Sequence, residues 1–101
     1  MNAKTILKTR TETPKGAVTC KVEDEGHMAR FRYYYPHTPS WKTPGSDDGS
    51  AIVEVVLHRP TGTVEFDVEE LTNSGRGCKR TMVSIDKDAA KALAQMLKEV
   101  V

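Results

Sequence analysis

The stretch from Ala51 to Glu69, AIVEVVLHRPTGTVEFDVE, decides the fold, because it has the pattern of two strands joined by a tight turn. Apolar residues alternate with polar or mixed ones in both halves, and β-branched and aromatic side chains are frequent. A period of two with this composition is typical of strands that bury one face. Between the halves, Arg59-Pro60-Thr61-Gly62 places proline at the second position of a type I turn and glycine where a positive φ is accepted. The stretch is therefore predicted to form a hairpin. The apolar positions are Ala51, Val53, Val55, Leu57, Val64, Phe66 and Val68.

The same alternation recurs at residues 4–12, 17–23, 28–35 and 79–85. Thr13-Pro14-Lys15-Gly16 repeats the turn pattern of the central hairpin, so the first two of these segments are predicted to form a second hairpin. Its first strand is expected at a sheet edge, where lysines discourage further pairing. No parallel crossover is visible, and an antiparallel meander is expected.

The period changes to that of a helix from Ala89 onward, and Asp86 is a good N-cap residue. A helix of about 15 residues is ~22 Å long, and we expect it to lie across one face of the sheet. The predicted fold class is α+β: a mostly antiparallel five- or six-stranded meander sheet covered on one face by a single C-terminal helix. The residues expected to cover that face are Leu93, Met96, Leu97 and Val100.

With 101 residues, the chain is predicted to form a single domain, residues 1–101. Residues 1–16 form a basic arm, either flexible or an edge hairpin, residues 36–50 a long loop rich in Pro, Gly, Ser and Asp, and residues 86–101 the C-terminal helix. Hydrophobic residues are 38%, a slightly low share for a globular domain. Because a thin core is often completed by a partner, we expect a homodimer.

The sequence contains neither a secretory signal nor the run of ~20 apolar residues that a membrane span needs, so a cytoplasmic location and no membrane partner are expected. It contains no phosphate-binding glycine loop, no G-x-S-x-G and no H-E-x-x-H motif. His27, His37 and His58, together with Cys20 and Cys78, lie too far apart in sequence for a recognised zinc pattern. We therefore expect no catalytic residues, no metal, no cofactor and no enzymatic activity.

A net charge of +1 argues against a whole-protein attraction to nucleic acid, but cations and exposed aromatic residues are clustered. Guanidinium groups bind phosphates, and an exposed aromatic ring can stack on a base for ~1–3 kcal/mol. Residues 1–21, with five cations and one carboxylate, could also contact phosphates or only aid solubility. The predicted nucleic-acid-binding residues are Arg30, Arg32, Tyr34, Trp41, Lys42, Arg76, Lys79 and Arg80.

The same residues allow two other interpretations. Arg30 and Arg32 could pair with an acidic row across the sheet, which would fix strand register and bind nothing. The segment from Tyr33 to Trp41, YYYPHTPSW, could form a protein-binding edge, or Trp41 could fold back over the small core. The alternative protein-contact residues are Tyr33, Tyr35, Trp41, Glu65, Asp67 and Glu69.

From about Val64 to the C-terminus, a strand, a turn with Gly75, Arg76, Gly77 and Lys79, a strand ending in Val83-Ser84-Ile85 and a terminal helix follow one another. This layout resembles the small single-stranded-DNA-binding transcriptional coactivators of the positive-cofactor type and their phage-encoded relatives. The resemblance implies that two copies pair through the terminal helix and hold single strands on a basic sheet surface, with Arg76, Lys79 and Arg80 as contacts.

The sequence thus predicts a small non-enzymatic binding module. Its first predicted partner is single-stranded nucleic acid, bound through a basic and aromatic sheet surface. The alternative is a protein-protein interaction module, such as a phage-type accessory or inhibitor protein that acts by surface contact.

Overall fold

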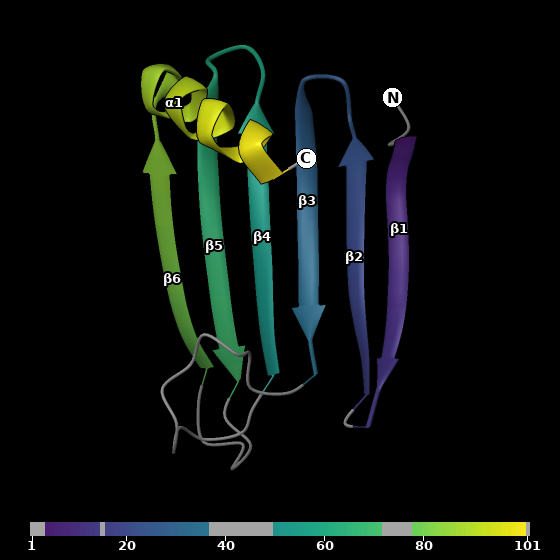
Figure 1. Cartoon of the computed structure of the whole chain (residues 1–101). Coiled ribbons are helices and arrows are strands. Elements are labelled where there is room, and N and C mark those ends of the chain that lie inside the picture. Colours follow the sequence, from purple (N-terminus) through teal and green to yellow (C-terminus); the bar gives the residue numbers. More distant parts are fainter. Residues whose placement is uncertain (1–3, 15, 37–49, 72–77, 101) are drawn as a thin grey trace.

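The computed structural model describes residues 4–14, 16–36, 50–71 and 78–100. They form one antiparallel sheet of six strands in the order of the chain, followed by a C-terminal helix (Figure 1). This confirms the predicted antiparallel meander with one C-terminal helix. The strands are β1 (Lys4–Thr13), β2 (Gly16–Asp24), β3 (Met28–Tyr35), β4 (Ser50–His58), β5 (Thr63–Leu71) and β6 (Cys78–Ile85); α1 spans Lys87–Leu97 and a 3-10 turn, η1, spans Lys98–Val100.

The turn between β4 and β5 follows the predicted chemistry. Gly62 has a φ of +75°, and its N–H donates to the carbonyl oxygen of His58 over 2.8 Å. A Cβ at this position would lie 2.8 Å from Cγ of Lys87 in the first turn of α1. Glycine at residue 62 therefore serves both the backbone conformation of the turn and the close approach of the helix.

Strand register gives the sheet two different faces. Directly paired residues point to the same side, so one row that crosses all six strands can be followed from partner to partner. We define the apolar face as the face that carries the row Leu7, Val22, Phe31, Val55, Phe66 and Val83. We define the polar face as the opposite one, which carries the row Lys8, Lys21, Arg32, Glu54, Asp67 and Met82.

The apolar face also has a second row next to the first: Thr9, Cys20, Tyr33, Val53, Val68 and Thr81. The aromatic rings along β3 pack on one another, with ring centroids 6.1 Å apart for Phe31 and Tyr33 and 4.6 Å apart for Tyr33 and Tyr35. Burial raises the pKa of the Cys20 thiol and, with a hydrogen bond to Tyr33 as a second cause, the pKa of the Tyr35 hydroxyl. Of the described residues, the buried hydrophobic ones are Cys20, Ala51 and Val56.

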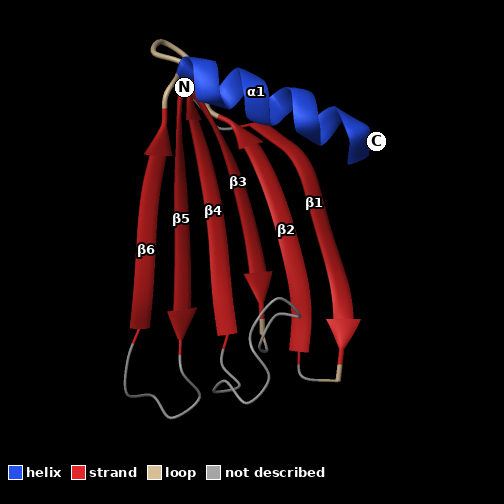
Figure 2. Ribbon diagram, turned by 60° about the vertical axis from the view of Figure 1, so that its left-hand side comes forward, coloured by secondary structure: helices blue, strands red, loops and turns tan. Residues whose placement is uncertain are grey.

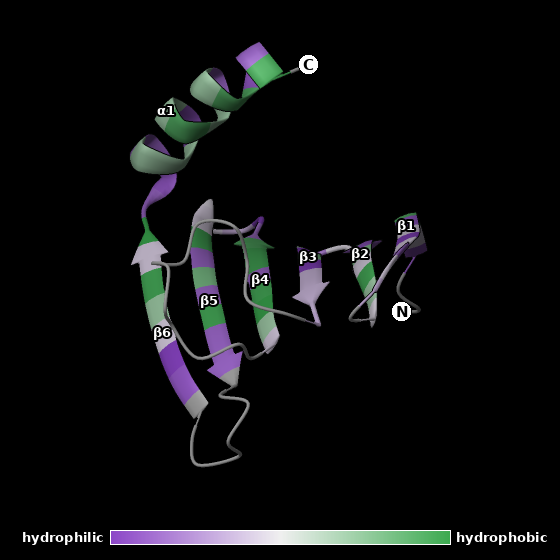
Figure 3. Cartoon of the chain, turned by 60° about the horizontal axis from the view of Figure 1, so that its bottom comes forward, coloured by the Kyte–Doolittle hydropathy of each residue, from purple (hydrophilic) through white to green (hydrophobic). Residues whose placement is uncertain are grey.

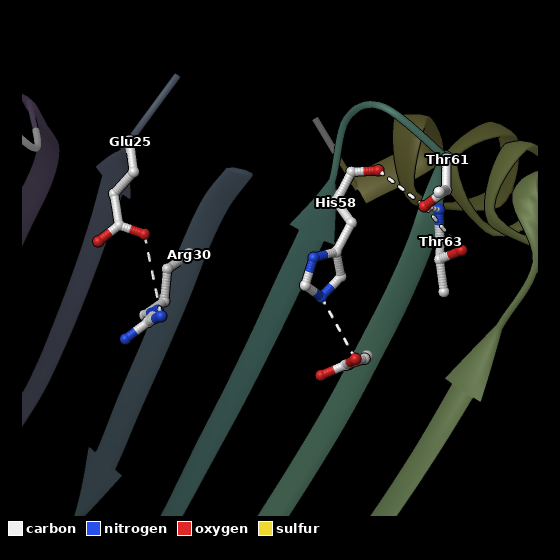
Figure 4. A network of polar contacts seen from close by, with 6 residues as sticks. Glu25, Arg30, His58, Thr61 and Thr63 are labelled. Atoms are coloured by element: carbon white, nitrogen blue, oxygen red, sulfur yellow. Dashed lines mark hydrogen bonds and ion pairs between the residues drawn. The ribbon is translucent and has the colours of Figure 1, made fainter. Parts of the chain in front are cut away.

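The helix covers much less of the sheet than predicted. It crosses the sheet only at the end near the β4–β5 turn (Figures 1 and 2). It lies on the side away from the polar-face side chains of Arg30 and His58, which is the side of the apolar face (Figure 4). Its main contacts are with β5, and none of its residues is buried. Seen from the other end, most of the sheet has no helix over it (Figure 3).

The reason for this placement is the short link before the helix. Asp86 is the only residue between β6 and α1, and its carboxylate caps the helix by accepting the N–H of Ala89 over 2.9 Å. The helix must therefore start at the end of β6. A helix 10–12 Å wide can cover only about a third of the ~30 Å length of a nine-residue strand when it runs across the strands.

The end of the sheet near the helix is also fixed by an arginine clamp. Arg59 donates to the Asp24 carboxylate over 2.6 Å and to the carbonyl oxygen of Gly26 over 2.7 Å, so it ties the β4–β5 turn to the β2–β3 turn. The hydrogen bond from Arg59, supported by the N–H of Gly26, lowers the pKa of Asp24.

No helix among the described residues is long and apolar enough to cross a membrane.

Candidate nucleic-acid interface

Three cations lie side by side on the polar face. Lys8 of β1 pairs directly with Lys21 of β2, and Lys21 pairs directly with Arg32 of β3. Neighbouring strands are ~4.8 Å apart, and like charges in directly opposed positions destabilise a sheet. Strand pairing favours opposite charges in such positions, so the pairs Lys8–Lys21 and Lys21–Arg32 are not explained by it.

These cations border a shallow hollow of about 430 Å³ on the β1, β2 and β3 side of the sheet. Among the described residues, Tyr34 is the one aromatic side chain that lines it, and Arg10 adds a fourth cation from the next row. We name this region the basic strip, defined by Lys8, Arg10, Lys21, Arg32 and Tyr34. The hollow is lined by Lys8, Thr9, Arg10, Thr19, Cys20, Lys21, Arg32 and Tyr34.

Two cations of the basic strip have weak ion-pair partners. Arg10 contacts Glu12 over 2.7 Å, and Lys21 contacts Glu23 over 3.4 Å. Arg10 and Glu12 are both exposed, and exposed pairs contribute 0–1 kcal/mol, so a phosphate can replace the carboxylate at small expense. Within the described part of the chain, no ion pair involves Lys8 or Arg32. The basic strip is thus a surface with positive charge available to an anion.

The polar face changes sign between β3 and β4. Glu54 lies directly opposite Arg32, and Glu65, Asp67 and Glu69 follow on β5. Arg80 of β6 donates to both oxygens of Asp67 over 2.6 to 3.2 Å. These hydrogen bonds lower the pKa of Asp67, and they engage the guanidinium of Arg80. A continuous basic track from Arg30 to Arg80 is therefore interrupted by the carboxylates of β4 and β5.

Arg30 and Arg32 do not form the pairs with the β5 carboxylates that strand register could have provided. Strand β4 lies between β3 and β5, so Arg30 is opposite Val56 and Arg32 is opposite Glu54. Arg30 instead approaches the carboxylate of Glu25 at 3.8 Å (Figure 4). Nε2 of His58 lies 3.3 Å from Oε1 of Glu65, and a dashed line from the labelled His58 marks this contact in the same figure.

The predicted nucleic-acid-binding residues fall into three groups. Arg30, Arg32, Tyr34 and Arg80 lie on the polar face, whereas Lys79 pairs with Glu70 and so belongs to the apolar face. Trp41, Lys42 and Arg76 lie outside the described residues. The alternative protein-contact residues are also divided: Tyr33 and Tyr35 are on the apolar face, Glu65, Asp67 and Glu69 are on the polar face, and Trp41 is not described.

The sequence analysis did not place three members of the basic strip in one site with Arg32 and Tyr34. These three are Lys8, Arg10 and Lys21. The turn at Thr13-Pro14-Lys15-Gly16 could have predicted that Lys8 and Lys21 are neighbours, because a tight turn fixes the register of its two strands. Thr13 and Gly16 form the last pair of that hairpin. Counting back from this pair places Lys8 opposite Lys21.

Metal binding finds no support in the part of the chain that the structure describes, since no three histidine, cysteine or carboxylate side chains come close enough to hold an ion there. Comparison with protein-family models, with curated proteins and with solved structures found no match for this chain. The geometry and charge of the two faces are therefore the basis for a functional proposal.

Proposed function

We propose that the protein binds single-stranded nucleic acid along the basic strip. The observation that carries this proposal is the row of Lys8, Lys21 and Arg32 in directly paired positions, two of them without an ion-pair partner among the described residues. A phosphate backbone resolves the repulsion within this row by supplying the missing negative charge. Such cation-phosphate contacts provide most of the affinity of non-specific binding to nucleic acid.

Tyr34 adds a contact of a different kind. Its side chain lines the same hollow as the cations, and Ile52 of β4 is its direct neighbour on the side away from Thr19. An aromatic ring beside cationic groups is the combination by which proteins hold single strands: the cations contact phosphates and the ring stacks on a base. Stacking requires unpaired bases, so Tyr34 favours a single strand over a duplex.

The width of the basic strip also favours a single strand over a duplex. Strands β1 to β3 span ~10 Å, and the carboxylate that follows Arg32 in the same row, Glu54 of β4, lies ~5 Å further across the sheet. A duplex presents two phosphate backbones separated by a groove about 6 or 12 Å wide. If one backbone lay over Lys21, the second would lie over the carboxylates of Glu54 or of β5. A single strand has no second backbone to be repelled.

The test is fluorescence anisotropy of a labelled oligonucleotide, single-stranded and as a duplex of the same sequence, titrated with the protein at several salt concentrations. We expect tighter binding to the single strand, with log K falling against log salt at a slope of about −2 to −3 for three or four phosphate contacts. The variant Lys21→Gln should reduce the magnitude of this slope by about 0.7. The matched control is Lys91→Gln, which changes net charge equally but lies on exposed α1.

Three results would contradict the proposal: no binding at low salt, stronger binding to the duplex, or equal effects of the two variants. The last result would indicate a general charge effect without a site on the polar face.

The second candidate function is protein binding, and the observation that favours it is the apolar face, most of which α1 leaves uncovered. This function would use the side of the sheet opposite the basic strip. The two functions are therefore compatible, and each can be tested without the other.

A further inference from the structure

The central row of the apolar face is hydrophobic across the whole sheet. Its members are Leu7, Val22, Phe31, Val55, Phe66 and Val83, one from each strand. None of them is buried, and the two on the edge strands, Leu7 and Val83, are exposed. The helix lies on the same side of the sheet (Figure 4), and Met96, Leu97 and Val100 of α1 and η1 are exposed. A folded chain therefore presents a broad apolar surface with a helix at one end.

The accessible area of the chain is larger than a folded monomer of this size requires. The chain has 7340 Å² of accessible surface and a mass of 11.2 kDa. Folded monomers of that mass expose about 5,700 Å² on average. The surplus, counted over all 101 residues, is about 1,600 Å² per chain. Stable obligate dimers bury 2,000 Å² or more in total, counted over both partners. Two copies would reach this size if each buried about 1,000 Å² of its accessible surface.

The charges at the margins of the apolar face favour a second copy as the occupant. Lys4 pairs with Asp24 at the end near the helix, and Glu70 pairs with Lys79 at the other end. With Arg59 on Asp24, both margins carry charges of both signs, so the face offers nothing that would select a partner of strong single-sign charge. A copy of the same face brings the same mixed margins and a matching hydrophobic centre.

We infer that two copies of this chain pack through their apolar faces, sheet against sheet, with the exposed side of α1 contributing to the contact. Sheets that pack face to face lie ~10 Å apart and interdigitate their side chains, which would bury the central row of both copies. A two-fold axis makes the same patch serve both partners. The polar faces then point outward on opposite sides of the dimer. This inference is independent of nucleic-acid binding, because it uses only the apolar face.

The test uses two neighbouring residues of β6. Val83 lies on the apolar face and is 54% exposed, whereas Met82 lies on the polar face and is 59% exposed. Because both side chains are already accessible in the single chain, a lysine at either position keeps its charge in water. Val83→Lys places a charge in the proposed interface, and Met82→Lys places the same charge outside it.

Analytical ultracentrifugation of the full chain and both variants gives the result. We expect the wild type and Met82→Lys to sediment as dimers, and Val83→Lys to dissociate at least about tenfold more readily, at unchanged circular dichroism. A monomeric wild type at 100 µM would overturn the inference. A dimer that Met82→Lys weakens as much as Val83→Lys, or more, would overturn it too.

A second measurement needs no variant that could misfold. In a dimer mixed from isotope-labelled and unlabelled chains, filtered nuclear Overhauser effects identify atoms that touch across the interface. The inference requires such contacts from the methyl groups of Val53, Val55 and Val68. Intermolecular contacts from Ile52 on the polar face, with none from these valines, would contradict it.

Discussion

In every strand of this sheet, successive paired residues point to opposite faces. Leu7, Val22 and Phe31 form half of the apolar row, and their sequence neighbours Lys8, Lys21 and Arg32 form half of the polar row. The backbone, the hydrogen bonds and the pairing are common to both rows, so only the side chains decide what each face can bind. The comparison teaches that a thin sheet can present two unrelated surfaces, and we propose one of them for phosphate and the other for a second copy of the chain.

The polar face contains a second contrast, between its basic and acidic halves. Lys8, Lys21 and Arg32 lie on β1 to β3, and Glu54 and Asp67 continue the same row on β4 and β5. The boundary falls between two directly paired residues, Arg32 and Glu54. The position of this boundary limits the width of an anionic ligand, which is why we propose a single strand and not a duplex as the ligand.

Reversing charge in the basic strip should have the largest effect. The double variant Lys21→Glu and Arg32→Glu removes two phosphate contacts and adds repulsion, so we expect affinity for a single strand to fall about 100-fold or more at low salt. Anisotropy titration measures this loss. The control Lys87→Glu and Lys91→Glu makes the same change of net charge on α1 and should leave affinity within about threefold. An equal loss in both double variants would remove the distinction between the faces.

Removing the aromatic ring of the basic strip should have the next largest effect. Because base stacking contributes ~1–3 kcal/mol, Tyr34→Ala should weaken single-strand binding about tenfold. Tyr34→Phe keeps the ring and should bind normally. Unlike a lost phosphate contact, the lost stacking should leave the salt slope unchanged. A Tyr34→Ala variant with wild-type affinity would show that cations alone form the interface.

If the apolar face is an interface, thermal stability depends on protein concentration. Between 2 and 200 µM, the unfolding midpoint of the wild type should rise by about 5 °C, because association stabilises only the folded chains. Val83→Lys should show a smaller rise or none. Differential scanning fluorimetry across this range is sufficient. A concentration-independent midpoint for the wild type would contradict an apolar face that is buried between copies.

The smallest effect concerns the acidic half of the polar face. The pKa of Asp67 is lowered by Arg80, so the ionised carboxylate stabilises the fold above the unfolded value of about 3.9. This contribution is lost as pH falls through the lower folded value. Asp67→Asn should therefore reduce stability by up to about 1 kcal/mol at pH 7, and the difference should decrease as pH falls below the unfolded value. Urea unfolding at a series of pH values from 7 downward measures it, and a difference that does not decrease would exclude the ion pair as its cause.

Much of the fold follows from local sequence. Alternation predicts the strands, and the turns at Pro14-Lys15-Gly16 and Pro60-Thr61-Gly62 predict two hairpins and the register within each. The expected meander implied this strand order, but local sequence could not establish it, because β3 and β4 are joined through residues 37–49 and no local rule decides which strands that segment brings together. Strand order places Arg32 opposite Glu54, and it places Asp67 where Arg80 can donate to it.

The helix and the candidate site also show that local sequence does not predict placement in the fold. The capping of the helix by Asp86 was predicted from sequence, but the position of the helix across the end of the sheet depends on the one-residue link to β6. Likewise, Arg32 and Tyr34 were predicted as contacts, whereas Lys8 and Lys21 join them only through the pairing of β1, β2 and β3. Local patterns predict which side of a strand a residue takes, and pairing between strands predicts its neighbours.

The most direct test of the two-face account is a nuclear magnetic resonance titration of labelled protein with a single-stranded oligonucleotide at low salt. The account predicts that the side-chain signals of Lys8, Lys21, Arg32 and the Tyr34 ring shift with added oligonucleotide. The methyl signals of Val53, Val55 and Val68 on the apolar face should stay in place. Shifts confined to those valines, or no shifts at all, would contradict the assignment of nucleic-acid binding to the polar face.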